Sequence, residues 1–206
     1  QKDEIMSDLR AIQERLGFKF SDLSLLQRAL THRSYLNEHP EHALEDNERL
    51  EFLGDSVLGF LVSEYLYETY PDLREGQLTT LRAALGRRDT LARLARQLRL
   101  GDYLLLGHGE DESGGRRRPA ILCATFEALV GALFLDQGID AVRVFVLSLM
   151  RDQVGALQRT ALNKDVKSRL QEWSQEALGV APRYRLLEAT GPDHAKEFPT
   201  EVTLMG

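Results

Sequence analysis

The chain has 206 residues, of which 43% are hydrophobic and 28% charged, and its formal net charge is −6 at pH 7. This balance excludes a disordered chain and is enough for one full core plus a second small domain. The N-terminal segment is charged and amphipathic, and no apolar run approaches the roughly 20 residues of a membrane-spanning helix, so we expect a cytoplasmic protein without membrane contact.

Helical periodicity dominates from residue 7 to about 156, where apolar residues recur at three- and four-residue spacing, so we predict an all-α first domain. A first helix ends at Gly17, and Ser21 caps a second. A third helix begins after the N-cap Asn47 and ends near Tyr70. Further helices are predicted over residues 77–85, 89–98 (capped by Asp89), 121–137 and 139–157, with a loop-rich segment over 101–115.

Residues 158–163 form a short polar connection, after which the pattern changes to helix, strand, strand. Trp173 lies on the apolar stripe of the helix, and residues 184–186 and 198–204 are predicted to be extended. Residues 191–193, Gly-Pro-Asp, supply a turn between the two strands. We therefore predict an α+β second domain.

Three carboxylates, Glu48, Glu51 and Asp55, are spaced so that they share one face of the third helix. Such a cluster is either a solvated helix face or a site for a divalent cation. Glu127 lies in an otherwise apolar helical stretch, where a bare charge is costly to bury without a partner. It either reaches water or an arginine at the edge of that face, or it belongs to the same site.

Oxygen ligands are the chemistry that these residues offer, because no Gly-rich phosphate loop, zinc-protease motif or serine nucleophile set is present. The single cysteine, Cys123, has no Cys or His at zinc-ligand spacing and is interpreted as a core residue. Carboxylate oxygens select Mg²⁺ or Mn²⁺, and two such ions stabilise an in-line phosphoryl displacement. Phosphodiester hydrolysis is the reaction that this donor set favours.

Arginines are concentrated in the middle of the chain, over residues 82–99 and 116–118, although the net charge is negative. Lys and Arg are the residues that bind nucleic-acid phosphates. The cluster indicates either a basic surface for a polyanion or ordinary solvated helix faces.

Several motifs resemble those of bacterial ribonuclease III. The longest is Asn47-Glu-Arg-Leu-Glu-Phe-Leu-Gly-Asp-Ser56, and further blocks follow the family order at residues 30–35, 75–83, 113–116 and 127–132. Lys164 to Glu172 resembles the opening of the double-stranded-RNA-binding domain of that family. The resemblance implies domains at 1–157 (catalytic, all-α) and 164–206 (RNA-binding), with residues 158–163 as linker.

What the resemblance implies for the site is a set of metal-binding catalytic residues, Glu51, Asp55 and Glu127, joined by an aspartate at the position of Ala124. Glu48 and Glu75 match supporting carboxylates at the cleft edge and the dimer contact. The cofactor implied is Mg²⁺, with Mn²⁺ as a substitute.

The resemblance also implies a homodimer, with two active centres in one valley for double-stranded RNA. Phe52, on the flank away from the acids, either inserts into a partner subunit or fills its own core. Gln171, Glu172 and His194 match residues that reach the minor groove. In the family this module continues with a third strand and a second helix, so residues 164–206 correspond to its N-terminal part.

The leading hypothesis is a metal-dependent endoribonuclease for double-stranded RNA that processes rRNA and mRNA precursors, with cleavage impaired by Ala124. The alternative is a non-cleaving double-stranded-RNA-binding protein on the same scaffold. A helical enzyme acting on small diphosphates is disfavoured, because its Asp-Asp-x-x-Asp cluster is missing.

Overall fold

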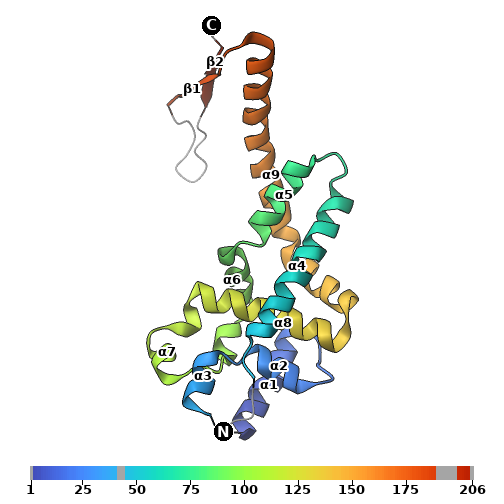
Figure 1. Cartoon of the computed structure of the whole chain (residues 1–206), viewed down its shortest axis with the longest axis vertical. Helices are drawn as coiled ribbons and strands as arrows, with labels where there is room; N and C mark the ends of the chain where they lie inside the picture. The colour runs from blue at the N-terminus through green and yellow to red at the C-terminus, as the bar shows by residue number, and fades with distance from the viewer. Residues whose placement is uncertain (1, 41–44, 189–198, 205–206) are drawn as a thin grey trace. The chain divides into compact units, whose positions relative to one another are not determined.

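Helices form the first part of the chain in the computed structural model, which describes residues 2–40, 45–188 and 199–204 (Figure 1). The chain divides into two units, residues 1–157 and 158–206. The helices of the first unit are α1 (Lys2–Leu16), α2 (Leu23–Ala29), α3 (Arg33–Glu38), α4 (Glu48–Thr69), α5 (Glu75–Leu85), α6 (Arg88–Gln97), α7 (His108–Glu112) and α8 (Pro119–Gln137), with short 3-10 turns η1 (Leu100–Tyr103) and η2 (Gly115–Arg117). No strand is assigned among the described residues of this unit, which confirms the prediction of an all-α domain.

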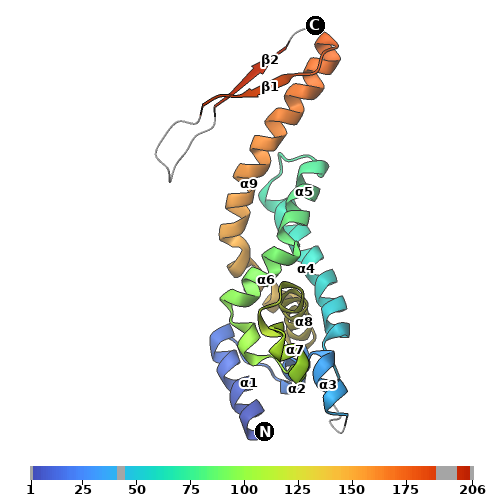
Figure 2. The same ribbon diagram turned by 90° about the vertical axis from the view of Figure 1, so that its left-hand side faces the viewer.

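The core of the first unit is built around α8, which packs against α2, α4 and α6 (Figure 2). Pro119 occupies the first turn, where its missing N–H costs nothing, and Gly138 ends the helix with a φ of 81°. Nearly every residue from Ile121 to Leu133 is buried. A helix that is apolar on all sides is stable only when neighbours cover all sides.

By length and composition α8 is also the one helix among the described residues that passes the test for a membrane span, contrary to our reading of the sequence. Most of it is buried within the helical unit, as the central helix of a folded domain is, so the feature is weak evidence for a membrane.

Two glycines allow α4 and α8 to cross with their backbones in contact. A Cβ at Gly54 would lie 2.6 Å from the carbonyl carbon of Glu127 and 2.9 Å from the nitrogen of Gly131. A Cβ at Gly131 would lie 3.1 Å from the carbonyl carbon of Leu50. Only residues without a side chain fit at such a crossing. This close approach brings the two acid-bearing helices together.

Several helix starts differ from the sequence predictions. Asp22, not Ser21, caps α2 by accepting a hydrogen bond from the backbone N–H of Ser24. The backbone N–H groups of both Ser21 and Asp22 donate to the carboxylate of Asp136. Asp89 lies inside the first turn of α6 rather than at its cap. A carboxylate there interacts favourably with the positive end of the helix dipole. Asn47 precedes α4 as predicted, but its side chain makes no capping bond.

Helix α9 (Ile139–Leu178) is continuous through residues 158–163, where we predicted a separate polar connection. These residues contain neither Gly nor Pro, so nothing in them terminates a helix. In the second unit, β1 (Arg183–Leu186) and β2 (Thr200–Thr203) pair antiparallel with Tyr184 opposite Val202. The helix-strand-strand order is therefore confirmed, while the predicted turn at 191–193 lies outside the described residues.

Candidate active site

Helices α4 and α8 bring four of the predicted carboxylates into one electrostatic cluster. Glu48, Glu51 and Asp55 follow one another along the first two turns of α4; Glu51 is half-buried, and the other two are exposed. Glu127 comes from α8 and is 9% exposed. The crossing of the two helices at Gly54 brings Glu127 near the acids that share one face of α4, which is the grouping that we predicted.

We call these four residues the carboxylate cluster. Burial and the repulsion between like charges raise the pKa of two of its members. Burial, reinforced by the charges of Asp55 and Glu51, raises the pKa of Glu127 to about 7. Burial, followed by the charges of Glu48 and Asp55, also raises the pKa of Glu51. No arginine or lysine is among the causes of either shift, so the edge-of-face reading of Glu127, with an arginine as its partner, is not what the structure shows.

Ala124 interrupts the buried run on α8, since it is half-exposed while residues 121–123 and 125–133 are buried. It lies one turn before Glu127, on the same face of the helix. A longer side chain at position 124 has room toward solvent. This is the position where the resemblance described above implies an aspartate, and here the residue supplies a methyl group.

Cys123 is the neighbour of Glu127 that the sequence analysis did not anticipate. Its thiol hydrogen-bonds the Glu127 carboxylate, and burial together with that carboxylate raises the pKa of Cys123 to about 12. The thiol is therefore protonated and donates to Glu127, while also serving as the core residue that we expected. The four-residue spacing of Cys123 and Glu127 is the signal that could have predicted the contact.

The donor set suits a hard divalent cation, because it consists of carboxylate oxygens, and no arginine or lysine is among the causes that shift the pKa of Glu51 or Glu127. Among the described residues, however, no three His, Cys, Asp or Glu side chains are already gathered as ligands around one point. The cluster provides negative charge and oxygen ligands, and the methyl side chain of Ala124 adds no oxygen to it.

Many of the central arginines are engaged within the protein. Arg116 donates to both oxygens of Asp111 and to the carbonyls of Gly101 and Leu104 at 2.8–3.1 Å, which anchors the loop before α8. Arg118 pairs with Glu110. Ion pairing of this kind was not among the alternatives drawn from the sequence, because the partners are acids from the loop-rich segment.

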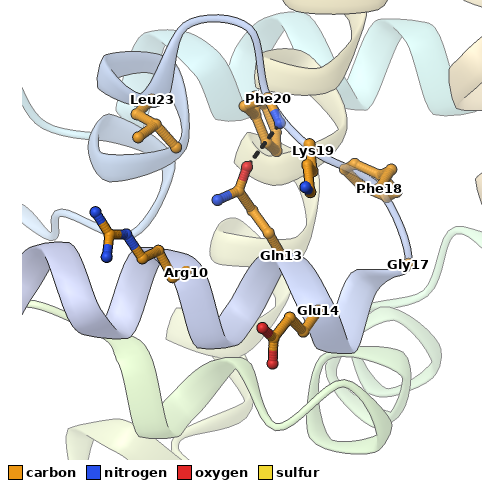
Figure 3. A pocket seen from close by; sticks show the side chains of 8 residues that line it. All are labelled: Arg10, Gln13, Glu14, Gly17, Phe18, Lys19, Phe20 and Leu23. Atoms are coloured by element: carbon orange, nitrogen blue, oxygen red, sulfur yellow. Dashed lines mark hydrogen bonds between the residues drawn. The ribbon is translucent and has the colours of Figure 1, made fainter.

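A surface pocket of about 530 Å³ lies at the junction of α1 and α2, and none of the clustered carboxylates lines it (Figure 3). Its lining includes Arg10, Phe18 and Lys19, and the Gln13 side chain accepts a hydrogen bond of 2.8 Å from the N–H of Phe20. None of the predicted site residues lines it, so the carboxylate cluster remains the candidate active site.

Comparisons with known proteins show to which family the chain is related. A family model described as Ribonuclease-III-like matches residues 22–153, a span that includes α4, α8 and all four clustered acids. The chain belongs to the ribonuclease III family. It is 49% identical over 193 residues to Ribonuclease 3 of a Roseiflexus species, covering 93% of this chain and 81% of that protein. Ribonuclease 3 of Dehalococcoides mccartyi is 47% identical, with 96% and 83% covered.

Among solved structures, the nuclease domain of ribonuclease III from Campylobacter jejuni aligns with a TM-score of 0.63 and 38% identity, covering 68% of this chain and 94% of that one. The description of that structure concerns flexibility in a region involved in dimer formation. These relatives establish the helical nuclease fold and the endoribonuclease class of the chain.

The structure describes only some of the other residues for which the resemblance implies a role. Glu75 is exposed at the first position of α5 and accepts a hydrogen bond of 3.1 Å from Thr79. Gln171 is exposed on α9. Glu172 lies on the same helix, but its side chain is outside the described part, and His194 lies outside the described residues altogether. Their roles stay predictions.

The raised pKa of Glu127 predicts how the metal-free ribonuclease III scaffold responds to pH. Its carboxyl titrates near 4.5 in the unfolded chain and near 7 in the folded one. The stability that this group contributes is therefore full below about pH 4.5 and is lost as the pH rises through about 7. We expect Glu127→Gln to remove this loss, so that its Tm advantage over the unmodified chain is larger at about pH 8 than at about pH 5.

The measurement is thermal unfolding in a chelator at both pH values, with Glu68→Gln, an exposed residue of α4, as control. A Tm difference for Glu127→Gln that is the same at both pH values would contradict the prediction.

Proposed function

We propose that the chain binds double-stranded RNA as a homodimer and holds Mg²⁺ in the carboxylate cluster, with Mn²⁺ as a substitute. As a ribonuclease III family member it is an endoribonuclease scaffold, and we infer that Ala124 impairs its cleavage step. The observation that carries the proposal is the convergence of Glu48, Glu51, Asp55 and Glu127 from two helices whose backbones touch.

The chain's own residues divide the work at such a site. Glu127 is held by the rigid core helix α8 and by the Cys123 thiol, whereas Glu51 and Asp55 lie on the open side of α4. When bound, the divalent cation supplies Lewis acidity that activates a water and stabilises the leaving oxygen of the phosphodiester. Glu48 is exposed and pairs with Arg33 at 3.4 Å, and its proposed role is that of a supporting residue at the rim of the site.

Processing of rRNA and mRNA precursors in the cytoplasm is part of the same proposal, as the setting in which an endoribonuclease of this family acts. We further propose that residues 164–206 are the N-terminal part of a double-stranded-RNA-binding domain, consistent with the helix-strand-strand order observed there. Gln171, Glu172 and His194 are its proposed minor-groove contacts.

A non-cleaving RNA-binding protein is the second candidate, and Ala124 is the observation that favours it. The retained carboxylates favour the endonuclease, because a protein that only binds RNA gains nothing from a buried Glu127 that burial and like charges destabilise. The substitution experiments at position 124 that separate the two are described in the Discussion.

Dimerisation is proposed to use the exposed flank of α4. Phe52 is 78% exposed, so the alternative that it fills its own core is wrong, and Phe60 and Tyr67 are also exposed on this helix. Exposed aromatic residues on one helix are typical of an interface. We expect Phe52→Asp to convert a micromolar dimer to monomer, because the charge would be buried without a partner.

Sedimentation velocity tests the dimer prediction directly. The matched control is Val144→Asp on α9, where the replaced side chain is similarly exposed at 74%. A dimer that survives Phe52→Asp, or one that Val144→Asp dissociates equally, would overturn the proposed interface.

RNA binding is expected to prefer duplex RNA to duplex DNA of the same sequence, because contacts to the 2′-hydroxyl are unavailable in DNA. Loss of one such hydrogen bond in Gln171→Ala should weaken RNA binding by about 1 kcal/mol, roughly fivefold, with DNA binding unaffected. Mobility shifts in calcium, repeated at two salt concentrations, measure this, with Gln97→Ala on α6 as control. Equal affinity for the two duplexes would refute the preference.

A further inference from the structure

Three chain segments meet at a buried junction beside the first turn of α4. Leu30 and Thr31 follow α2, and Leu105 accepts and donates backbone hydrogen bonds to this segment at 2.9–3.1 Å. The N–H of Asn47 donates to the carbonyl of Thr31 at 3.0 Å. Thr31 is fully buried, and Asn47 is 2% exposed.

Asn47 does not use its side chain as an N-cap residue normally does. The amide of Asn47 donates instead to the carbonyl of Ala29 at 3.3 Å, which is one of the carbonyls left without a helical partner at the end of α2. The capping bond to α4 is made by Asp46, whose Oδ1 accepts from the N–H of Glu48 at 3.1 Å. The buried amide thus joins the end of α2 to the start of α4.

This junction is linked to both halves of the carboxylate cluster. The carbonyl of Asn47 accepts the N–H of Glu51 at 2.8 Å, and Glu48 is the next residue along the chain. Helix α2, which Asn47 contacts, also packs against α8, the helix that carries Glu127 (Figures 1 and 2). Side chains of a metal site must be held in place by the groups behind them.

We propose that Asn47 is a positioning residue for the carboxylate cluster, because its buried amide holds the first turn of α4, with Glu48 and Glu51, at a set place relative to Glu127. The inference rests on the proposed metal-binding function. Neighbouring contacts support it: Arg28 of α2 donates to the carbonyl of Asp46 at 3.1 Å and pairs with Glu45 at 2.5 Å. Residues 45–47, directly before α4, are therefore attached to α2.

Asn47→Ser is the informative substitution, because serine is as good an N-cap residue as asparagine but is too short to reach the Ala29 carbonyl. Mn²⁺ binding to the otherwise unmodified chain is measured by electron paramagnetic resonance of the free ion, and in parallel on the Ala124→Asp background. We expect Asn47→Ser to weaken Mn²⁺ binding by about 10-fold or more on both backgrounds. A residue that served only as a helix cap would leave the affinity unchanged.

Thr90→Val is the matched control. Thr90 is also buried and donates to one backbone carbonyl, that of Ala84 at 3.0 Å, but it joins α5 to α6 rather than α2 to α4. The proposal expects both variants to lose stability, and only Asn47→Ser to lose Mn²⁺. Asn47→Asp keeps the shape and removes the N–H donor, and it replaces the serine variant if that variant is too unstable to study. Because its added negative charge by itself favours Mn²⁺ binding, weaker binding in Asn47→Asp supports the positioning role, and equal or tighter binding overturns it.

The experiment separates failure of the positioning role from failure of the proposed metal site. Unchanged Mn²⁺ affinity in Asn47→Ser, or an equal loss in Thr90→Val, would overturn the positioning role and leave the metal site standing. Absence of Mn²⁺ binding by both the unmodified chain and Ala124→Asp would instead overturn the proposed function on which the inference depends.

Discussion

Ala124→Asp should restore magnesium-dependent cutting of a long RNA duplex, raising the rate at least 10- to 100-fold above that of the unmodified chain. Position 124 is half-exposed one turn before Glu127, so an aspartate there adds oxygens to the carboxylate cluster without filling the core. Mg²⁺ demands near-ideal octahedral geometry, and a methyl group cannot supply a ligand. Losing the support of a metal ligand commonly costs 10–100-fold, and loss of a ligand itself should cost no less.

Binding and cleavage should separate in this comparison. RNA affinity in calcium should be almost the same for Ala124→Asp and the unmodified chain, because Lys and Arg side chains supply most of the affinity for nucleic-acid phosphates. Ala11→Asp, an exposed alanine of α1, adds the same charge away from the cluster and should restore nothing. Brisk magnesium-dependent cleavage by the unmodified chain would show that the cluster tolerates Ala124. Failure of Ala124→Asp to cut would favour the non-cleaving RNA-binding protein.

Gly54→Ala should cause the largest loss of stability of any single methyl addition to α4. The new Cβ would lie 2.6 Å from the Glu127 carbonyl carbon and 2.9 Å from the Gly131 nitrogen, and both atoms belong to the backbone of α8. No rotamer change relieves such a contact, so the two helices must move apart. Overpacking of this kind costs about 1–3 kcal/mol and occasionally more, and we expect a loss at or above the upper end of that range.

Function should fail together with stability at this position, since separating α4 from α8 also separates Glu51 and Asp55 from Glu127. Denaturant unfolding measures the first effect, and Mn²⁺ binding at a temperature where the variant is folded measures the second. Gly76→Ala is the control, because Gly76 on α5 has no neighbour within 4 Å of the added Cβ, and alanine there should leave stability equal or up to about 1 kcal/mol higher. Similar losses in both variants would show that the helix crossing is not the cause.

Local patterns in the sequence predicted several features of this chain. The helical period placed Glu48, Glu51 and Asp55 on one face, and the apolar surroundings of Glu127 marked it as unusual, because both features depend only on residues within a few turns. The motif order led to the ribonuclease III family before any coordinates. The apolar stripes predicted the long helices α1, α4, α5, α6 and α8 with ends that differed by a few residues, but they divided the continuous helix α9 into two helices with a polar connection between them.

Contacts between distant segments were decided only by the tertiary structure. Asn47 has the composition of an N-cap, but its amide turns to Ala29, 18 residues earlier, because Asp46 already makes the capping bond. Asp22 rather than Ser21 caps α2, and the backbone N–H groups of both residues donate to Asp136, which lies 115 residues after Ser21 in the chain.

The carboxylate cluster also depends on a contact between segments that are distant in the sequence. Helical spacing predicted each half of it, but the crossing of α4 and α8 at Gly54 and Gly131 brings the halves together. That crossing also gives Glu127 its pKa of about 7, since burial and the charges of Asp55 and Glu51 act through space rather than along the chain. Sequence alone determined which acids are present and how they are spaced on each helix. The packing of two backbones determined that they share one site.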